Sequence, residues 1–156
     1  MSALEQSPRI TPFLWFDGNA EQAAEFYMSV FKNSRKVAEL RNPGEAPGPK
    51  GGVLTITFEL DGTRFTALNG GPNYKFNEAV SFMVRCDSQD EVDYYWSRLT
   101  EGGDEIACGW LRDKFGLCWQ IVPARLPELI QHPKAMQAMM TMKKLDIAAL
   151  ERAAQE

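Results

Sequence analysis

The clearest pattern in the chain lies in residues 53–60, where the even-numbered positions are apolar and most odd-numbered positions are polar. A period of two predicts a half-buried strand. The dipeptide Asp61-Gly62 follows directly and is typical of a tight hairpin turn. We therefore expect an antiparallel partner strand over residues 63–69, before the chain turns at 70–72.

Two helical patterns each follow an apolar, strand-like stretch, at residues 10–17 and 79–87. The first helix is expected over residues 19–31, with Asn19 as N-cap and Gln22 three residues later. The second is expected to begin at Ser88, with Glu91 in the same relation, and to end at the glycine pair 102–103. Both have their apolar residues at helical spacing, so each should pack on a sheet.

The remaining segments complete the predicted element order. Residues 42–52 contain three prolines and four glycines, which indicates a loop. Three further segments are expected to be strands: 34–40, 105–112 and 115–123. Three helical patterns follow: 126–131, 133–142 and 146–154.

The two halves repeat each other. Asn19 aligns with Ser88 and Tyr27 with Trp96 at a constant offset, and a strand precedes and a hairpin follows each helix. Such self-similarity indicates a duplicated unit. The sequence thus predicts an α+β fold of two tandem βαβββ modules, at residues 1–72 and 73–124, with a helical tail at 125–156.

Composition narrows the function classes. The 156 residues are 44% hydrophobic and 24% charged, as in ordinary globular proteins. The net charge of -4 and pI of about 5.1 argue against a nucleic-acid partner. No apolar stretch reaches the roughly 18 residues of a membrane span, and the N-terminus does not have the pattern of a signal peptide. We expect a cytoplasmic protein with no membrane partner.

Three sequence segments carry a family resemblance: WFDGNAEQAAEFY, FTALNGGP, and the run from CDSQDEVDYYW to GGDEIACGWLRDKFGLCWQIVP. They resemble the PhnB-like branch of the vicinal oxygen chelate superfamily, which includes glyoxalases, bleomycin-resistance proteins and extradiol dioxygenases. Members of that branch are often labelled 3-demethylubiquinone 3-methyltransferase. The resemblance covers about residues 10–150. It implies two curved mixed sheets around a cleft, and a homodimer, in some relatives with exchanged modules.

The resemblance also implies where a metal would bind, because metal-dependent relatives take His, Glu or Gln ligands from the first and last strands of both modules. The repeat puts these positions at about Pro12, Ser81, Ala67 and Gln120. Only Gln120 has a suitable side chain. The single histidine, His132, lies outside both modules. We therefore expect no metal and no other cofactor.

The methyltransferase label can be tested against the residues. Enzymes that use S-adenosylmethionine typically have a Rossmann-like sheet with a glycine-rich first turn. Here the turn after the first strand, FDGNAE, has one glycine, and no series of parallel βα units follows. The residues do not support that cofactor site.

The catalytic residues remain unknown, with Cys108 and Gln120 as weak candidates. Cys86, Cys108 and Cys118 are far apart in sequence, and their simplest interpretation is as buried, reduced thiols. Cys108 lies between Ala107 and Gly109 and is the most plausible reactive thiol. A nucleophile would need a lowered pKa or an adjacent base.

A small-molecule site is the remaining hypothesis for the cleft. Strand alternation places Cys118 and Gln120 on one face, and the duplicated pattern suggests a matching face in the first module. The expected ligand-binding residues are Phe65, Asn69, Met83, Arg85, Trp110, Cys118 and Gln120. Arg85 would favour an anionic ligand. Alternatively, Asn69 ends a strand, Arg85 forms a surface ion pair and the tryptophans belong to the core.

Three functions therefore stay open. The first is binding of a small aromatic or anionic molecule without a metal. The second is an enzyme of the superfamily: a lyase, a dioxygenase or the labelled methyltransferase. The third is a dimeric structural or regulatory module, for which the methionines at 136, 139, 140 and 142 offer an adaptable apolar face.

Overall fold

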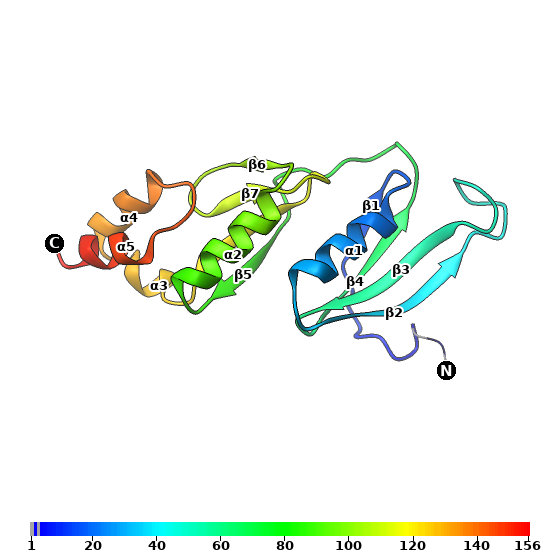
Figure 1. The fold of residues 1–156 in the computed structure, drawn as a ribbon, viewed down its shortest axis with the longest axis horizontal. Coiled ribbons are helices and arrows are strands. Elements are labelled where there is room, and N and C mark those ends of the chain that lie inside the picture. The colour runs from blue at the N-terminus through cyan, green and yellow to red at the C-terminus, as the bar shows by residue number, and fades with distance from the viewer. Residues whose placement is uncertain (1, 3) are drawn as a thin grey trace. The chain divides into compact units, whose positions relative to one another are not determined.

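The computed structural model describes residues 2 and 4–156, and its ribbon is shown in Figure 1. The chain divides into two compact units, the first ending at Lys75 and the second spanning Phe76–Glu156. Each unit contains one four-stranded mixed sheet with the same strand order relative to its helix. The α+β class and the duplication predicted from sequence are confirmed.

The first unit comprises β1 (Phe13–Phe16), α1 (Ala20–Val30), β2 (Ser34–Arg41), β3 (Val53–Leu60) and β4 (Thr63–Asn69). Its strand order is β1-β4-β3-β2. The first strand runs parallel to β4, and the other neighbours are antiparallel. Both strands of the β3–β4 hairpin have the bounds expected from the sequence. Asp61 and Gly62 have φ angles of 49° and 87°, as the tight turn requires.

Helix α1 covers one face of this sheet. The ring of Tyr27 stacks on Phe58 with the ring centroids 6.4 Å apart, and Phe58 stacks on Phe65 at 5.8 Å. All three rings are buried, together with Leu14 and Phe16 of β1. Because side chains alternate along a strand, the intervening residues project from the opposite face of the sheet.

The second unit comprises β5 (Ser81–Cys86), α2 (Gln89–Thr100), β6 (Asp104–Glu105), β7 (Trp110–Arg112) and β8 (Cys118–Pro123), in the order β5-β8-β7-β6. The single strand expected over 105–112 is wrong: a turn at 106–109 separates β6 from β7. Cys108 and Gly109 have φ angles of 57° and 86° there, which no strand accommodates. The unit therefore has three strands after its helix.

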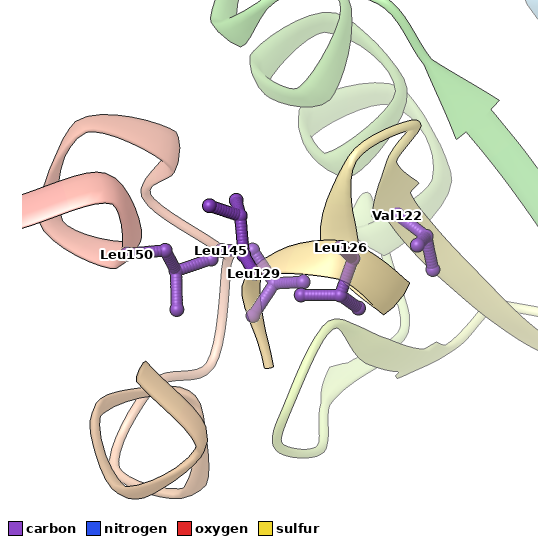
Figure 2. Packing of buried hydrophobic residues seen from close by; sticks show 5 residues of the cluster. All are labelled: Val122, Leu126, Leu129, Leu145 and Leu150. Carbon is purple, nitrogen blue, oxygen red and sulfur yellow. The ribbon is translucent and has the colours of Figure 1, made fainter. Parts of the chain in front are cut away.

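The tail belongs to the second unit and forms α3 (Leu126–Leu129), α4 (Pro133–Met140) and α5 (Ile147–Ala154). Figure 2 shows the apolar cluster that joins it to the sheet. The buried members of this cluster are Val122, Leu126, Leu129, Leu145 and Leu150. Val122 is the only one contributed by a strand, so the tail is anchored at the end of β8. Within the described chain, no helix is long and apolar enough to cross a membrane.

The predicted helix caps differ in outcome. The Ser88 hydroxyl accepts a hydrogen bond from the Glu91 backbone N–H at 3.2 Å, as predicted. Asn19 occupies the N-cap position of α1 but its side chain makes no capping hydrogen bond. Instead the side-chain oxygen of Asn69 accepts from the Ala20 N–H at 2.9 Å. The cap thus comes from β4, because the parallel β1–β4 pair brings Asn69 opposite Phe16.

Candidate binding face on the second sheet

The open face of the second sheet is defined by which residues its helix covers. Leu111, Trp119 and Ile121 are buried, and they alternate with the residues that face the other way. Those other residues form two rows across β5, β8 and β7. The first row is Met83, Gln120 and Trp110, and the second is Ser81, Cys118 and Arg112. We call these two rows the binding face.

Hydrogen bonding connects the two rows. The Gln120 amide nitrogen donates to the Ser81 hydroxyl at 2.9 Å. The amide oxygen of Gln120 accepts no hydrogen bond from the described residues. Met83, beside Gln120, is 61% exposed, and Trp110 on the other side is half-buried. A polar amide therefore lies between two accessible apolar side chains, which is the composition of a small-ligand surface.

Charge lies at one margin of the binding face. Arg112 forms ion pairs with Glu78 and, at 3.6 Å, with Asp104. Its neighbour Cys118 is fully buried, and this burial raises the pKa of the thiol more than Arg112 lowers it. The thiol is therefore protonated near neutral pH and is a poor nucleophile. Cys86 behaves in the same way, since burial raises its pKa to about 12.

Five of the residues predicted to bind a ligand lie on one face of the second sheet: Met83, Arg85, Trp110, Cys118 and Gln120. Arg85 is the outlier among them. It lies opposite Val122, which the tail cluster buries, and it pairs with Asp87 at 3.4 Å on the exposed surface. Whether any of the five binds a ligand stays a prediction.

The predicted placement of Phe65 and Asn69 on the open face of the first sheet is wrong. Phe65 lies opposite Phe58 and stacks on it beneath α1. Asn69 donates to the Val53 carbonyl at 3.0 Å in addition to capping α1. The error is one of register: matching Ala67 to Gln120 pairs a helix-facing position with an open one. The hairpin itself held the signal, because a two-residue turn at 61–62 places residue 65 opposite residue 58.

The residues that do form the open face of the first sheet were not among the predicted ligand-binding residues. Phe13 lies opposite Thr66, and Trp15 opposite Leu68. The indole N–H of Trp15 donates to the Gly71 carbonyl at 2.9 Å, and its ring meets Tyr74 edge-on at 4.8 Å. On the second sheet, Ser81 and Arg112 were not among the predicted ligand-binding residues, although the same register sets both beside Cys118.

The remaining candidates lie away from the two rows. Cys108 is in the 106–109 turn, with its sulfur 3.9 Å from that of Met140. His132 lies in a tail hollow of about 280 Å³, together with Arg125, Glu128 and Glu151. In the part of the chain that the structure describes, no three His, Cys, Asp or Glu side chains gather as a metal site.

Comparison with known proteins agrees with this architecture. Residues 8–122 match the family model described as 3-demethylubiquinone-9 3-methyltransferase. The PhnB protein from Bacillus cereus is 34% identical, and the match covers 75% of this chain and 100% of that one, with a TM-score of 0.69. The fold is that of the vicinal oxygen chelate proteins. Within that class, the chain belongs to the PhnB-like 3-demethylubiquinone-9 3-methyltransferase family.

More distant structures share the fold alone. A Pseudomonas aeruginosa protein is 23% identical with a TM-score of 0.60, over 75% of this chain and 98% of that one. The fosfomycin resistance protein FosX from Mesorhizobium loti is 15% identical with a TM-score of 0.55, over 80% and 98% respectively. A search among curated proteins gave no significant match.

Proposed function

We propose that the chain binds a small molecule on the binding face of the second sheet, without a metal ion. The observation that carries this proposal is the Gln120–Ser81 hydrogen bond, flanked by Met83 and Trp110 in register. The Gln120 amide oxygen, which accepts no hydrogen bond from the described part of the chain, can supply one polar contact, and the two apolar neighbours can supply dispersion contacts. The family's methyltransferase label does not enter the proposal.

The chemistry of the face favours a planar, apolar ligand with one hydrogen-bonding group. Trp110 offers an aromatic surface and Met83 a polarisable, adaptable one. Gln120 can accept from the ligand through its amide oxygen, or donate to it through the second N–H of its amide nitrogen while the first stays bonded to Ser81. An anionic ligand would engage Arg112 only by competing with the carboxylates of Glu78 and Asp104. The affinities of neutral and of anionic aromatic molecules should therefore be compared.

The family and the fold support the proposal indirectly. The FosX proteins are described as fosfomycin resistance proteins, and one of their structures carries manganese and sulfate. A sulfate ion is thus bound to a protein of this fold, which supports the proposal that the fold can present a site for a small molecule. These proteins share only the fold with this chain, so the ligand and any metal requirement must be measured on this chain itself.

Titration with benzamide and benzoate, followed by ligand-observed NMR, tests the proposal. We expect both to bind the wild-type chain at millimolar concentration and Met83→Glu to bind them at least about tenfold more weakly, because it adds a charge to the apolar side of the face. Leu40→Glu is the matched control, since Leu40 is also 61% exposed but lies on β2 of the first unit. Equal loss in both variants, or no binding by the wild type, would contradict the proposal.

The metal requirement has its own measurement. We expect protein purified without chelator to contain less than stoichiometric divalent metal by elemental analysis, and its benzamide affinity to be unchanged by EDTA. Stoichiometric metal would contradict the prediction that residues such as Ser81 and Gln120 do not form a metal site.

The expected homodimer also remains a proposal. Of the four tail methionines, Met139 and Met142 pack against the chain's own cluster, whereas Met136 and Met140 are 38% and 63% exposed. If these two form a contact between copies, light scattering should give twice the monomer mass and Met140→Glu should reduce it. A monomer at micromolar concentration would contradict the dimer.

A further inference from the structure

A short segment of the tail, residues 142–145, is bonded to the turn that precedes Trp110; we call this segment the strap. The Cys108 N–H donates to the Met142 carbonyl and the Gly109 N–H to the Lys143 carbonyl, both at 2.8 Å. Two successive backbone amides of the turn are thus satisfied by two successive carbonyls of the strap. Without the strap, both donors would lose their partners, which is costly for groups removed from water.

Side-chain packing reinforces the backbone contacts. A Cβ atom on Gly109 would lie 3.1 Å from the Leu145 side chain and 3.0 Å from the Ile121 carbonyl oxygen. Leu145 is fully buried and belongs to the cluster in Figure 2. The turn therefore fits closely between the strap and β8, and the Ile121 N–H donates to the Gly109 carbonyl at 2.8 Å.

The other side of the strap is fixed to α2. The Gln89 amide donates to the Leu145 carbonyl at 3.1 Å and accepts from the Ile147 N–H at 2.9 Å. Lys144 adds an ion pair with Asp93 at 2.8 Å. The strap is consequently held both by the apolar cluster and by α2, and the 106–109 turn is held in place through its hydrogen bonds to the strap.

The turn leads directly into the binding face. The Trp110 N–H donates to the Ala107 carbonyl at 2.9 Å, and the Trp110 carbonyl accepts from the Ile106 N–H at 3.0 Å. Trp110 is therefore the closing residue of the same turn that the strap holds. The family match ends at residue 122, so the turn lies within the matched residues and the strap outside them.

We infer that the strap, through Leu145, is a positioning element for Trp110 and so tunes the ligand affinity of the binding face. This inference rests on the proposed function as far as ligand affinity is concerned. Its structural part, the control of the 106–109 turn, is independent of any ligand. A side chain that orients a contact residue typically acts by being packed rigidly behind it.

Leu145→Ala and Leu150→Ala form a matched pair, because both leucines are fully buried in the same cluster and Leu145 supplies the side-chain atoms nearest to Gly109. Hydrogen exchange should show the Cys108 and Gly109 amides exchanging about tenfold faster in Leu145→Ala than in Leu150→Ala. The Trp110 indole resonance should shift in the first variant only. Equal exchange and equal shifts in the two variants would overturn the inference.

Benzamide titration gives the functional readout. We expect Leu145→Ala to weaken benzamide binding about fivefold, and Leu150→Ala to change it less than twofold, at temperatures where both are fully folded. If Leu145→Ala does not fold, Gln89→Ala removes the two Gln89 hydrogen bonds that hold the strap to α2, without opening a core cavity and with the Lys144–Asp93 pair left in place. The same exchange and affinity changes are then expected in reduced size.

The outcomes separate the two proposals. No benzamide binding by the wild type contradicts the proposed function, while the exchange rates still decide the structural inference. Binding by the wild type with equal affinity in both leucine variants overturns the positioning role and leaves the proposed function intact.

Discussion

Asn69 and Ala20 lie 49 residues apart in sequence, and the side-chain oxygen of Asn69 accepts the Ala20 N–H at 2.9 Å. Its amide nitrogen donates to the Val53 carbonyl at 3.0 Å, so one side chain joins α1 to the hairpin of the first sheet. We expect Asn69→Ala to lower the free energy of unfolding by about 1–2 kcal/mol, as loss of a helix cap does. Urea denaturation measures this change.

Two controls make the Asn69 prediction specific. Asn69→Asp keeps the acceptor for Ala20 and loses only the donor to Val53, so it should be less destabilising than alanine. Asn73→Ala changes an exposed asparagine in the connector and should have almost no effect. Unchanged stability in Asn69→Ala would contradict the capping role. If the variant also lost benzamide binding, Asn69 would be a ligand-binding residue after all.

Asp113 performs a comparable task in the second unit. Its side chain is 2% exposed and accepts from the backbone N–H groups of Phe115 and Leu117 and from the Trp119 indole, at 2.8–3.0 Å. We expect Asp113→Ala to cost roughly 3 kcal/mol in the free energy of unfolding, because three donors lose a charged acceptor at once. Chemical denaturation monitored by tryptophan fluorescence measures it.

The conservative variant tests the role of the second carboxylate oxygen. In the wild type, one carboxylate oxygen of Asp113 accepts from both backbone amides and the other accepts from the Trp119 indole. In Asp113→Asn, the amide oxygen can still accept from the backbone amides, but the NH₂ group then faces the Trp119 N–H, donor against donor. It should therefore lie between wild type and alanine. Asp90→Asn, at an exposed position, serves as the comparison. A stability for Asp113→Ala as high as that of Asp90→Asn would contradict the prediction.

The sequence predicted local structure better than the side-chain contacts made across the chain. The β3–β4 hairpin followed from the alternation over residues 54–60 and a two-residue turn, and the same rule would have put Phe65 beside Phe58 under α1. By contrast, nothing near Ala20 in sequence indicates that its cap is Asn69, because the two meet only through parallel pairing of β1 and β4. The sequence alone cannot distinguish an asparagine at a strand end that caps a distant helix from one that binds a ligand.

In the candidate site too, local features were predicted from the sequence and contacts with distant residues were not. Gln120 and Cys118 share one face, as predicted, because they lie two residues apart on β8 and side chains alternate along any strand. The 106–109 turn was missed, since a non-glycine residue with positive φ, here Cys108, has no local signal when its amide is satisfied by a distant tail carbonyl. The position of Trp110 therefore depends on residues some thirty positions later, which no pattern near it reveals.

The three cysteines should differ sharply in reactivity. Burial raises the pKa of the Cys118 thiol and raises that of Cys86 to about 12, so neither forms appreciable thiolate at pH 8. Cys108 is partly exposed in its turn. We expect iodoacetamide to alkylate Cys108 first in the folded protein, with peptide mass spectrometry locating the label. In urea all three should react at similar rates; equal labelling of Cys118 and Cys108 in the folded state would contradict this order.

Glu59 gives the first sheet a pH-dependent contribution to stability. It pairs with Arg64 at 2.8 Å and Arg35 at 3.0 Å, and the Arg64 hydrogen bond is the largest cause of a pKa lowered from the ordinary value of 4.5. A folded-state pKa below the unfolded one stabilises the protein above pH 4.5, and this stabilisation is lost as the pH falls through the lowered value.

Comparing the melting temperature of wild type and Glu59→Gln across pH tests that sign. We expect the wild type to melt higher at neutral pH, and the two curves to converge as the pH falls through the lowered pKa of Glu59, below which the carboxylate is protonated in both states. The difference should also shrink in about 1 M salt, because the Arg35 side chain of the Arg35–Glu59 pair is 63% exposed and accessible to screening ions. Glu45→Gln, at an exposed loop position, is the control and should track the wild type at every pH. A difference between wild type and Glu59→Gln that grows toward acid pH would reverse the sign of the pKa shift and contradict the ion-pair explanation.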